Sequence, residues 1–234
     1  MTLVTEALDR IARQCSITAP SSWLTATEDQ HVELRDDFML EAVDDILERL
    51  DLPSPIGAQT TIAGDGSATY SLPSDFKRLA RDRMAVYDTT QDRIVHPVTT
   101  DGAWTDLTDV GPGAERFYRL TGYDGAWSIT FEDAPSSGTS IVVSYVSKNW
   151  LINGTAKSDL TDPADVLLLP RRVIEAGTVW RWRERRGLPY QDKYLEYEAL
   201  IARLSNDTRG RRVVNLGERK AVRWQDNVPN TIPS

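Results

Sequence analysis

Hydrophobic residues recur at helical spacing in four stretches, two near each end of the chain. Apolar side chains return every three or four positions there, which places them on one stripe of a helix. The stretches are residues 3–15, 34–50, 167–180 and 190–204. Pro53 and Gly187 end two of the helices, and the third has Pro163 in its first turn with a kink or restart at Pro170. Because amphipathic helices bury their stripes against one another, we expect a four-helix bundle built from both termini.

The middle of the chain changes to the alternating period of β-strands. Short runs rich in β-branched and aromatic residues are separated by turn residues, and Gly64-Asp65-Gly66-Ser67 between the first two runs predicts a β-hairpin. The expected strands are residues 60–63, 68–72, 83–88, 93–98, 115–120, 127–131 and 139–146. Six or seven short strands joined by turns indicate a small antiparallel β-sandwich or barrel.

These patterns predict an α+β protein in which a β domain interrupts a helical one. Residues 1–56 and 151–205 form the helical bundle, and residues 57–150 form the inserted β-sandwich or barrel. Residues 206–234 lack a clear helical stripe and interleave basic with apolar residues near a proline-rich end. Such a segment fits an extended C-terminal arm that becomes ordered on a partner, the alternative being a flexible terminus.

Charge is distributed unevenly along the chain. Residues 1–110 hold 9 Lys and Arg against 20 Asp and Glu, whereas residues 171–234 hold 14 against 8. The net charge of −8 over 234 residues argues against a general nucleic-acid binder. Opposite charges at the two ends suit a subunit that docks on copies of itself or on another ring.

Targeting signals and disulfides are not expected. Cys15 is the only cysteine and lies on the apolar stripe of the first helix, so it is expected in the core. The first residues lack the basic start and apolar run of a signal peptide, and no apolar stretch of about 18 residues occurs. We therefore expect a protein made in the cytoplasm that does not enter a membrane.

The sequence does not point to an enzyme, and no cofactor or metal is expected. His31 and His96 stand in unrelated contexts, and the common hydrolase, zinc-protease and P-loop motifs are missing. Asp159, Asp162 and Asp165 have the chemistry to hold a calcium ion, yet helix capping before Pro163 explains them more simply.

Several motifs along the chain together resemble a known family. They are Tyr70-Ser71-Leu72-Pro73-Ser74-Asp75-Phe76-Lys77-Arg78-Leu79, Tyr118-Arg119-Leu120, Phe131-Glu132-Asp133-Ala134-Pro135, Ile141-Val142-Val143-Ser144-Tyr145-Val146, Leu168-Leu169-Pro170, residues 177–187 and Tyr194-Leu195-Glu196-Tyr197-Glu198. In this order over residues 1–210 they resemble the head-to-tail adaptor (connector) proteins of tailed bacteriophages and gene transfer agents, related to the tail tubular protein A type.

The resemblance implies a structural virion protein. Such adaptors form a ring, usually of twelve subunits, beneath the portal protein and extend the DNA channel toward the tail. The expected partners are further copies, the portal, and a tail terminator, stopper or tail tube protein, while DNA passes through without specific binding. The C-terminal arm would dock on the portal, through Arg209, Arg211, Arg212, Val213, Val214 and Trp224.

Charge alone provides a hypothesis for the contact between subunits. Arginines of the third helix would face the acidic side of the second helix in the next subunit. The residues are Arg181, Arg183, Arg185 and Arg186 against Asp36, Asp37, Glu41, Asp44, Asp45 and Glu48. Two alternatives stay open: the arginines contact DNA in the channel, or the acidic face lines the channel and keeps DNA from adhering.

A second hypothesis comes from a different class, a β-sandwich module that binds carbohydrate or protein. Trp104, Tyr123 and Trp127 would be its exposed stacking platforms, although a hydrophobic core explains Trp127 equally well. A glycosidase-like enzyme is the weakest of the three hypotheses.

Overall fold

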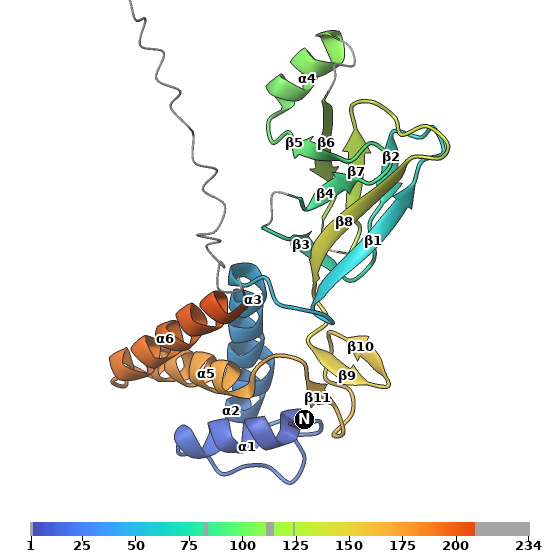
Figure 1. The fold of residues 1–234 in the computed structure, drawn as a ribbon. Helices are drawn as coiled ribbons and strands as arrows, with labels where there is room; N and C mark the ends of the chain where they lie inside the picture. The colour runs from blue at the N-terminus through green and yellow to red at the C-terminus, as the bar shows by residue number, and fades with distance from the viewer. Residues whose placement is uncertain (1, 82–83, 111–114, 124, 209–234) are drawn as a thin grey trace, which may run out of the picture.

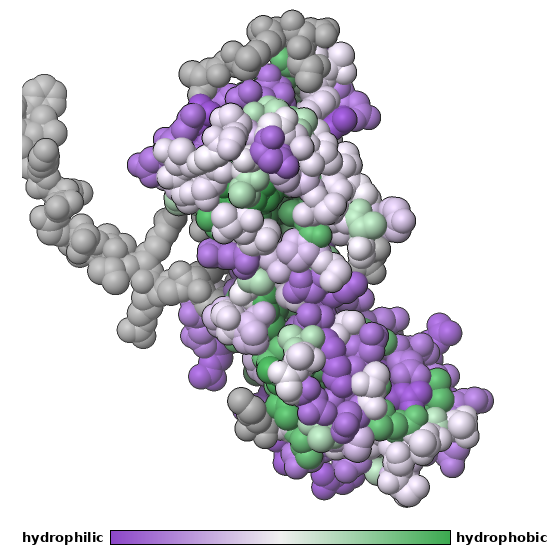
Figure 2. Space-filling view, turned by 90° about the vertical axis from the view of Figure 1, so that its right-hand side faces the viewer, coloured by the Kyte–Doolittle hydropathy of each residue, from purple (hydrophilic) through white to green (hydrophobic). Residues whose placement is uncertain are grey.

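The computed structural model describes residues 2–81, 84–110, 115–123 and 125–208. A helical body and a β-barrel lie one above the other, with a small sheet beside the helices (Figure 1). The mixed α+β class is therefore confirmed. In the view of Figure 2, hydrophilic residues cover much of both parts and hydrophobic residues emerge in scattered patches.

The helical body is assembled around one central helix. Its helices are α1 (Val4–Gln14), α2 (Asp29–Val32), the π-helical η1 (Glu33–Phe38), α3 (Met39–Arg49), α5 (Arg171–Arg185) and α6 (Gln191–Thr208). The segments α2, η1 and α3 follow one another as a single rod, which confirms the second predicted helix. Helix α5 contacts α1, η1, α3 and α6 and is buried on several sides.

The helices do not form the predicted four-helix bundle. Figure 1 shows the α2–η1–α3 rod crossing α5 and α6, whereas the axes of a bundle run nearly parallel. The predicted apolar stripes are nevertheless in the core, which includes Leu8, Ile46, Val173 and Ile201. Cys15 is also buried, as predicted.

The segment before α5 differs from the prediction. No helix begins at Pro163; the short strand β11 (Val166–Leu167) occupies this region, and α5 begins only after Pro170. The buried Asp165 carboxylate accepts hydrogen bonds from the backbone N–H of Thr161 and Asp162 and pairs with Lys157 at 2.7 Å. Asp165 therefore stabilises a loop, and its interpretation as a helix cap is wrong.

The β-barrel is one curved, nearly closed sheet. Its strands are β1 (Gly57–Ala63), β2 (Thr69–Ser71), β3 (Phe76–Leu79), β4 (Val86–Asp88), β5 (Arg93–Pro97), β6 (Arg116–Thr121), β7 (Ser128–Phe131) and β8 (Ser140–Ser147). The order is β1-β8-β4-β5-β6-β7-β2, with β3 also paired to β8. Alternate residues such as Phe76, Ile129, Phe131 and Val143 fill its interior.

Two details of the predicted sheet are wrong. Strands β1 and β2 do not form a hairpin, because β1 pairs with β8 and β2 pairs with β7. The intervening loop bonds elsewhere: the N–H of Gly64 donates to Thr139 and that of Gly66 donates to Pro135. The pair β5–β6 is parallel, and the unpredicted helix α4 (Asp101–Val110) provides the crossover that parallel strands need.

A small second sheet ties the N-terminal segment to the region before α5. It consists of β9 (Leu151–Asn153), β10 (Thr155–Lys157) and β11, none of which was predicted. Backbone hydrogen bonds from Val4 to Asp165 and from Leu167 to Thr2 hold the start of α1 beside β11.

Arginine side chains from the barrel fix it to the helical body. Arg78 donates from Nε to the carbonyl of Leu47 (2.9 Å) and from Nη2 to that of Leu50 (2.8 Å), and its Nη1 pairs with Asp51 at 2.8 Å. Arg81 donates to the Glu48 carbonyl. These donors satisfy carbonyls that an α-helix leaves without partners at its C-terminus, so they cap α3 and orient the barrel on it.

Candidate functional site

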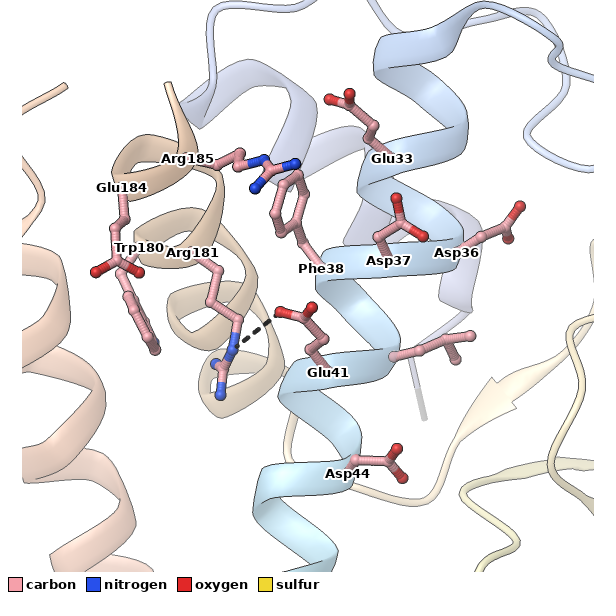
Figure 3. Close-up of a pocket in the computed structure, with 11 residues that line it drawn as sticks. Glu33, Asp36, Asp37, Phe38, Glu41, Asp44, Trp180, Arg181, Glu184 and Arg185 are labelled. Carbon is pink, nitrogen blue, oxygen red and sulfur yellow. Dashed lines mark ion pairs between the residues drawn. The ribbon is translucent and has the colours of Figure 1, made fainter. Parts of the chain in front are cut away.

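A groove of about 790 Å³ is lined by residues of η1 and α3 on one side and of α5 on the other (Figure 3). Six carboxylates and two guanidinium groups line it, together with the apolar side chains of Phe38, Leu40 and Trp180. The charged lining residues are Glu33, Asp36, Asp37, Glu41, Asp44, Glu184, Arg181 and Arg185. The structure thus places members of both predicted interface sets on the two walls of one groove within a single chain.

Arg181 crosses the groove from the α5 side. Its guanidinium lies 3.7 Å from the Glu41 carboxylate and 3.2 Å from that of Asp45, and it donates to the Gly177 carbonyl. The same group lies 4.5 Å from the centre of the Trp180 ring, within the range of a cation–π contact. Arg181 therefore joins α5 to α3 inside the chain.

Polar contacts also join α3 to α6. The Tyr197 hydroxyl donates to Asp45 at 2.6 Å, and Arg49 makes two hydrogen bonds to Glu198 at 2.7 and 2.6 Å. Burial and the bond to Asp45 raise the pKa of Tyr197. The hydrogen bonds from Arg49 lower the pKa of Glu198 below its ordinary value. These charge-assisted bonds join α3 to α6, and the pair of Arg181 with Asp45 joins α3 to α5.

Gly177 makes the crossing of these helices possible. A Cβ atom at this position would lie 2.9 Å from Cβ of Ala42 and 3.0 Å from Cε2 of Tyr197. Carbon atoms in contact normally lie about 3.5–4 Å apart, so any side chain here would separate the helices.

Most of the predicted interface residues have partners within the chain. Arg183 lies 3.9 Å from Asp192, and Arg186 lies 2.7 Å from Glu33. Arg185 has no ion pair within 4.0 Å to a residue that the structure describes. On the acidic side the pairs are Arg35 with Asp36, Lys77 with Asp44, Lys77 with Glu48 and Arg49 with Asp45. Asp37 has no ion pair with any described residue, and contact between subunits stays a prediction.

Comparison with known protein families shows to which family the chain belongs. The family model of the SU10 adaptor protein matches residues 2–223, which include the helical body and the barrel. The chain belongs to the SU10 adaptor protein family. This confirms the resemblance to phage adaptors and an adaptor's structural role, but it does not confirm the tail tubular protein A subtype. Comparison with curated proteins gave no match.

The predicted portal-docking residues of this adaptor lie outside the described residues. They are Arg209, Arg211, Arg212, Val213, Val214 and Trp224. Helix α6 extends to Thr208, slightly beyond the predicted end at residue 205.

The aromatic platform of the alternative hypothesis is largely absent from the adaptor surface. Trp104 is only 9% exposed, and the Arg119 guanidinium covers its ring at 4.6 Å. Trp127 is partly buried against Phe76. Tyr123 alone of the three is exposed, so the prediction of three exposed aromatics is wrong.

Within the described part of the adaptor, no three His, Cys, Asp or Glu side chains are grouped as a metal site would need. The same residues include no helix that is long and apolar enough to cross a membrane.

Sequence reasoning missed the function of Lys77, Arg78 and Arg81 in joining the barrel to α3. The available signal was the basic pair Lys77-Arg78, which follows soon after Pro73-Ser74-Asp75. The preceding helix ends in a series of acidic residues, with which such a basic pair can interact. Asp75 itself accepts hydrogen bonds from the hydroxyls of Tyr145 and Ser147, so this motif anchors β3 to β8.

Proposed function

We propose that this adaptor forms a ring, with twelve copies, between the portal and the tail of a phage particle. The observation that carries the proposal is the family match over residues 2–223, which extends across the helical body and the barrel. In this proposal the ring continues the DNA channel and contacts a tail terminator, stopper or tail tube protein on its far side.

The physical properties of the described residues support a structural component. Short polar bonds join α3 to α6, the pair of Arg181 with Asp45 joins α3 to α5, and Arg78 fixes the barrel to α3. A stiff subunit of this kind can transmit position from one partner ring to the next. The net charge of −8 favours a DNA channel that does not retain DNA, because like charges repel.

The C-terminal residues provide the portal contact in this proposal. Residues 209–234 carry six Lys and Arg against two Asp and Glu, together with Val213, Val214 and Trp224. Mixed basic and apolar segments of this kind gain affinity by becoming ordered on a partner surface.

The first experiment is native mass determination of the full chain, alone and mixed with the portal protein encoded in the same genome. A discrete complex with a full ring of adaptor copies on each portal is the expected result and gives the stoichiometry. A variant that lacks residues 209–234 should remain folded and fail to join the portal. If the full chain shows no association at high micromolar concentration and moderate salt, the proposed function is wrong.

A further inference from the structure

A basic patch lies on the helical body away from the acidic groove. Arg10 and Arg13 are exposed on α1, and Arg171 and Arg172 belong to the first turn of α5. They surround Glu175, which is 9% exposed. A shallow cleft of about 310 Å³ between α1 and α5 is lined by residues of this patch. We call Arg10, Arg13, Arg171 and Arg172 the arginine patch.

Charge within the arginine patch is not balanced. Arg171 lies 3.2 Å from Glu175, and this is the patch's only ion pair with a described residue. Arg10, Arg13 and Arg172 act on Glu175 only at longer range, where they partly offset the effect of burial, which raises its pKa. One carboxylate cannot neutralise four guanidinium groups, so the patch is a positively charged surface.

The acidic groove has the opposite imbalance. Its lining holds six carboxylates against two guanidinium groups. Four of these carboxylates also have an ion-pair partner in their own chain: Glu33 with Arg186, Asp36 with Arg35, Glu41 with Arg181 and Asp44 with Lys77. The side chains of Glu41 and Asp44 are 62% and 68% exposed, which leaves them accessible to a partner. Asp37 and Glu184 have no ion pair with a described residue.

The two surfaces lie on nearly opposite faces of α5. Successive residues of an α-helix are rotated by about 100°, so Trp180, Arg181 and Glu184 project roughly 120–180° away from the side of Glu175, and Arg185 about 80° away. The patch and the groove therefore cannot meet within one chain. Two complementary surfaces on opposite sides of a subunit produce a head-to-tail contact, which closes into a ring when the rotation permits.

We propose that the arginine patch of one copy docks on the acidic groove of the next copy. This inference rests on the proposed ring and names the surfaces that would form it. The groove keeps the role predicted for its carboxylates, while the basic partner comes from α1 and the first turn of α5. Arg181 and Arg186 are poorer candidates for that partner, because carboxylates of their own chain already bind them.

Cysteine cross-linking of full-length protein tests the contact even where it is weak. Arg13→Cys on the patch is mixed with tagged Leu40→Cys in the groove under mild oxidation; Leu40 is 39% exposed. The native Cys15 should not interfere, since burial raises the pKa of its thiol to about 12. The control replaces Leu40→Cys with Asp159→Cys, an exposed site outside the groove. We expect the mixed disulfide to exceed the control at least about tenfold and to decrease with added salt.

A charge swap provides the matched second test on the same cross-linking pair. Arg10→Glu with Arg172→Glu, or Asp37→Lys with Glu184→Lys, should each lower the yield at least about fivefold. Mixing a copy that carries the two glutamate substitutions on its patch with a copy that carries the two lysine substitutions in its groove should restore the yield of the mixed disulfide. None of the four substituted residues has an ion pair with a described residue, so these changes break no ion pair inside the chain.

Two results would overturn this interface. One is a mixed disulfide no more abundant than the control, and the other is a failure of the swapped pair to recover. Binding of a short DNA duplex that is lost in the Arg10→Glu, Arg172→Glu variant would instead assign the patch to nucleic acid. Portal binding is measured on the same proteins. If the portal complex forms but the cross-link does not, only the proposed interface is wrong. If the wild-type protein does not bind the portal, the proposed function is wrong.

Discussion

Gly177 is the position at which the packing of the helical body can be tested most directly. Replacing Gly177 by alanine places a methyl group 2.9 Å from Cβ of Ala42 and 3.0 Å from Cε2 of Tyr197. The side chain of Ala42 is fully buried and attached directly to the α3 backbone, so it cannot rotate away. Either α3 and α5 separate, or the Tyr197 ring moves.

The expected cost follows from three effects. Overpacking of a core costs about 1–3 kcal/mol, and weakening the bond from Tyr197 to Asp45 costs about 1 kcal/mol more. The higher helix propensity of alanine relative to glycine offsets about 1 kcal/mol of this loss. The Gly177→Ala variant should therefore lose about 1–3 kcal/mol of unfolding free energy, which lowers the melting temperature by several degrees.

Urea unfolding followed by tryptophan fluorescence measures this loss, because Trp180 and Trp182 lie on the same helix. The matched control is Gly102→Ala in α4, where a Cβ atom would meet nothing within 4 Å. That substitution should be neutral or stabilise the protein by up to about 1 kcal/mol. Adding Ala42→Gly to Gly177→Ala removes the closest contact and should recover part of the stability.

The reasoning would be refuted by a Gly177→Ala variant as stable as the wild type. It would also fail if Ala42→Gly gave no recovery beyond its own effect, since the two positions would then not be in contact. Either result would mean that α3 and α5 do not cross as closely as the structure places them.

Two further predictions concern the contacts that hold the protein together. Arg78→Met leaves carbonyls at the end of α3 without donors and should cost about 2–3 kcal/mol in urea unfolding, whereas Arg185→Met should change stability by less than about 0.5 kcal/mol; equal losses would contradict the capping role. Arg49 lowers the pKa of Glu198, so their bond stabilises the fold above about pH 4.3, the ordinary value, and this stabilisation is lost as the pH falls through the lower folded pKa. Glu198→Gln should therefore reduce the acid dependence of the urea midpoint below about pH 5, and an unchanged profile would show that Glu198 does not contribute.

Local periodicity was sufficient to predict the main helices and most strands of the barrel. The stripe that contains Leu34, Phe38 and Ile46 is buried as predicted, because a helix with one apolar face has few ways to remove it from water. Strands β5 and β7 were predicted within one residue at each end. Very short strands such as β9 and β11 were missed, since two or three residues show no period.

Strand pairing could not be predicted from the same pattern. Gly64-Asp65-Gly66-Ser67 has the composition of a hairpin turn, yet β1 pairs with β8 across the chain. A strand selects its neighbour through the whole set of side chains it buries, and alternation alone does not specify that set.

Sequence by itself determined most of the helical segments, most of the barrel strands and where charge of each sign accumulates. Only the tertiary structure decided which charges meet. Arg181 and the acidic face were predicted to pair between subunits, but the folded chain brings Arg181 to Glu41 and Asp45 of its own α3. It also brings Arg10 and Arg172, which are remote in sequence, close enough to the carboxylate of Glu175 for both to act on it electrostatically. Helix and strand periods are local properties of the chain, whereas the pairing of charges depends on how Gly177 lets α5 cross α3 and on which surfaces that crossing leaves exposed.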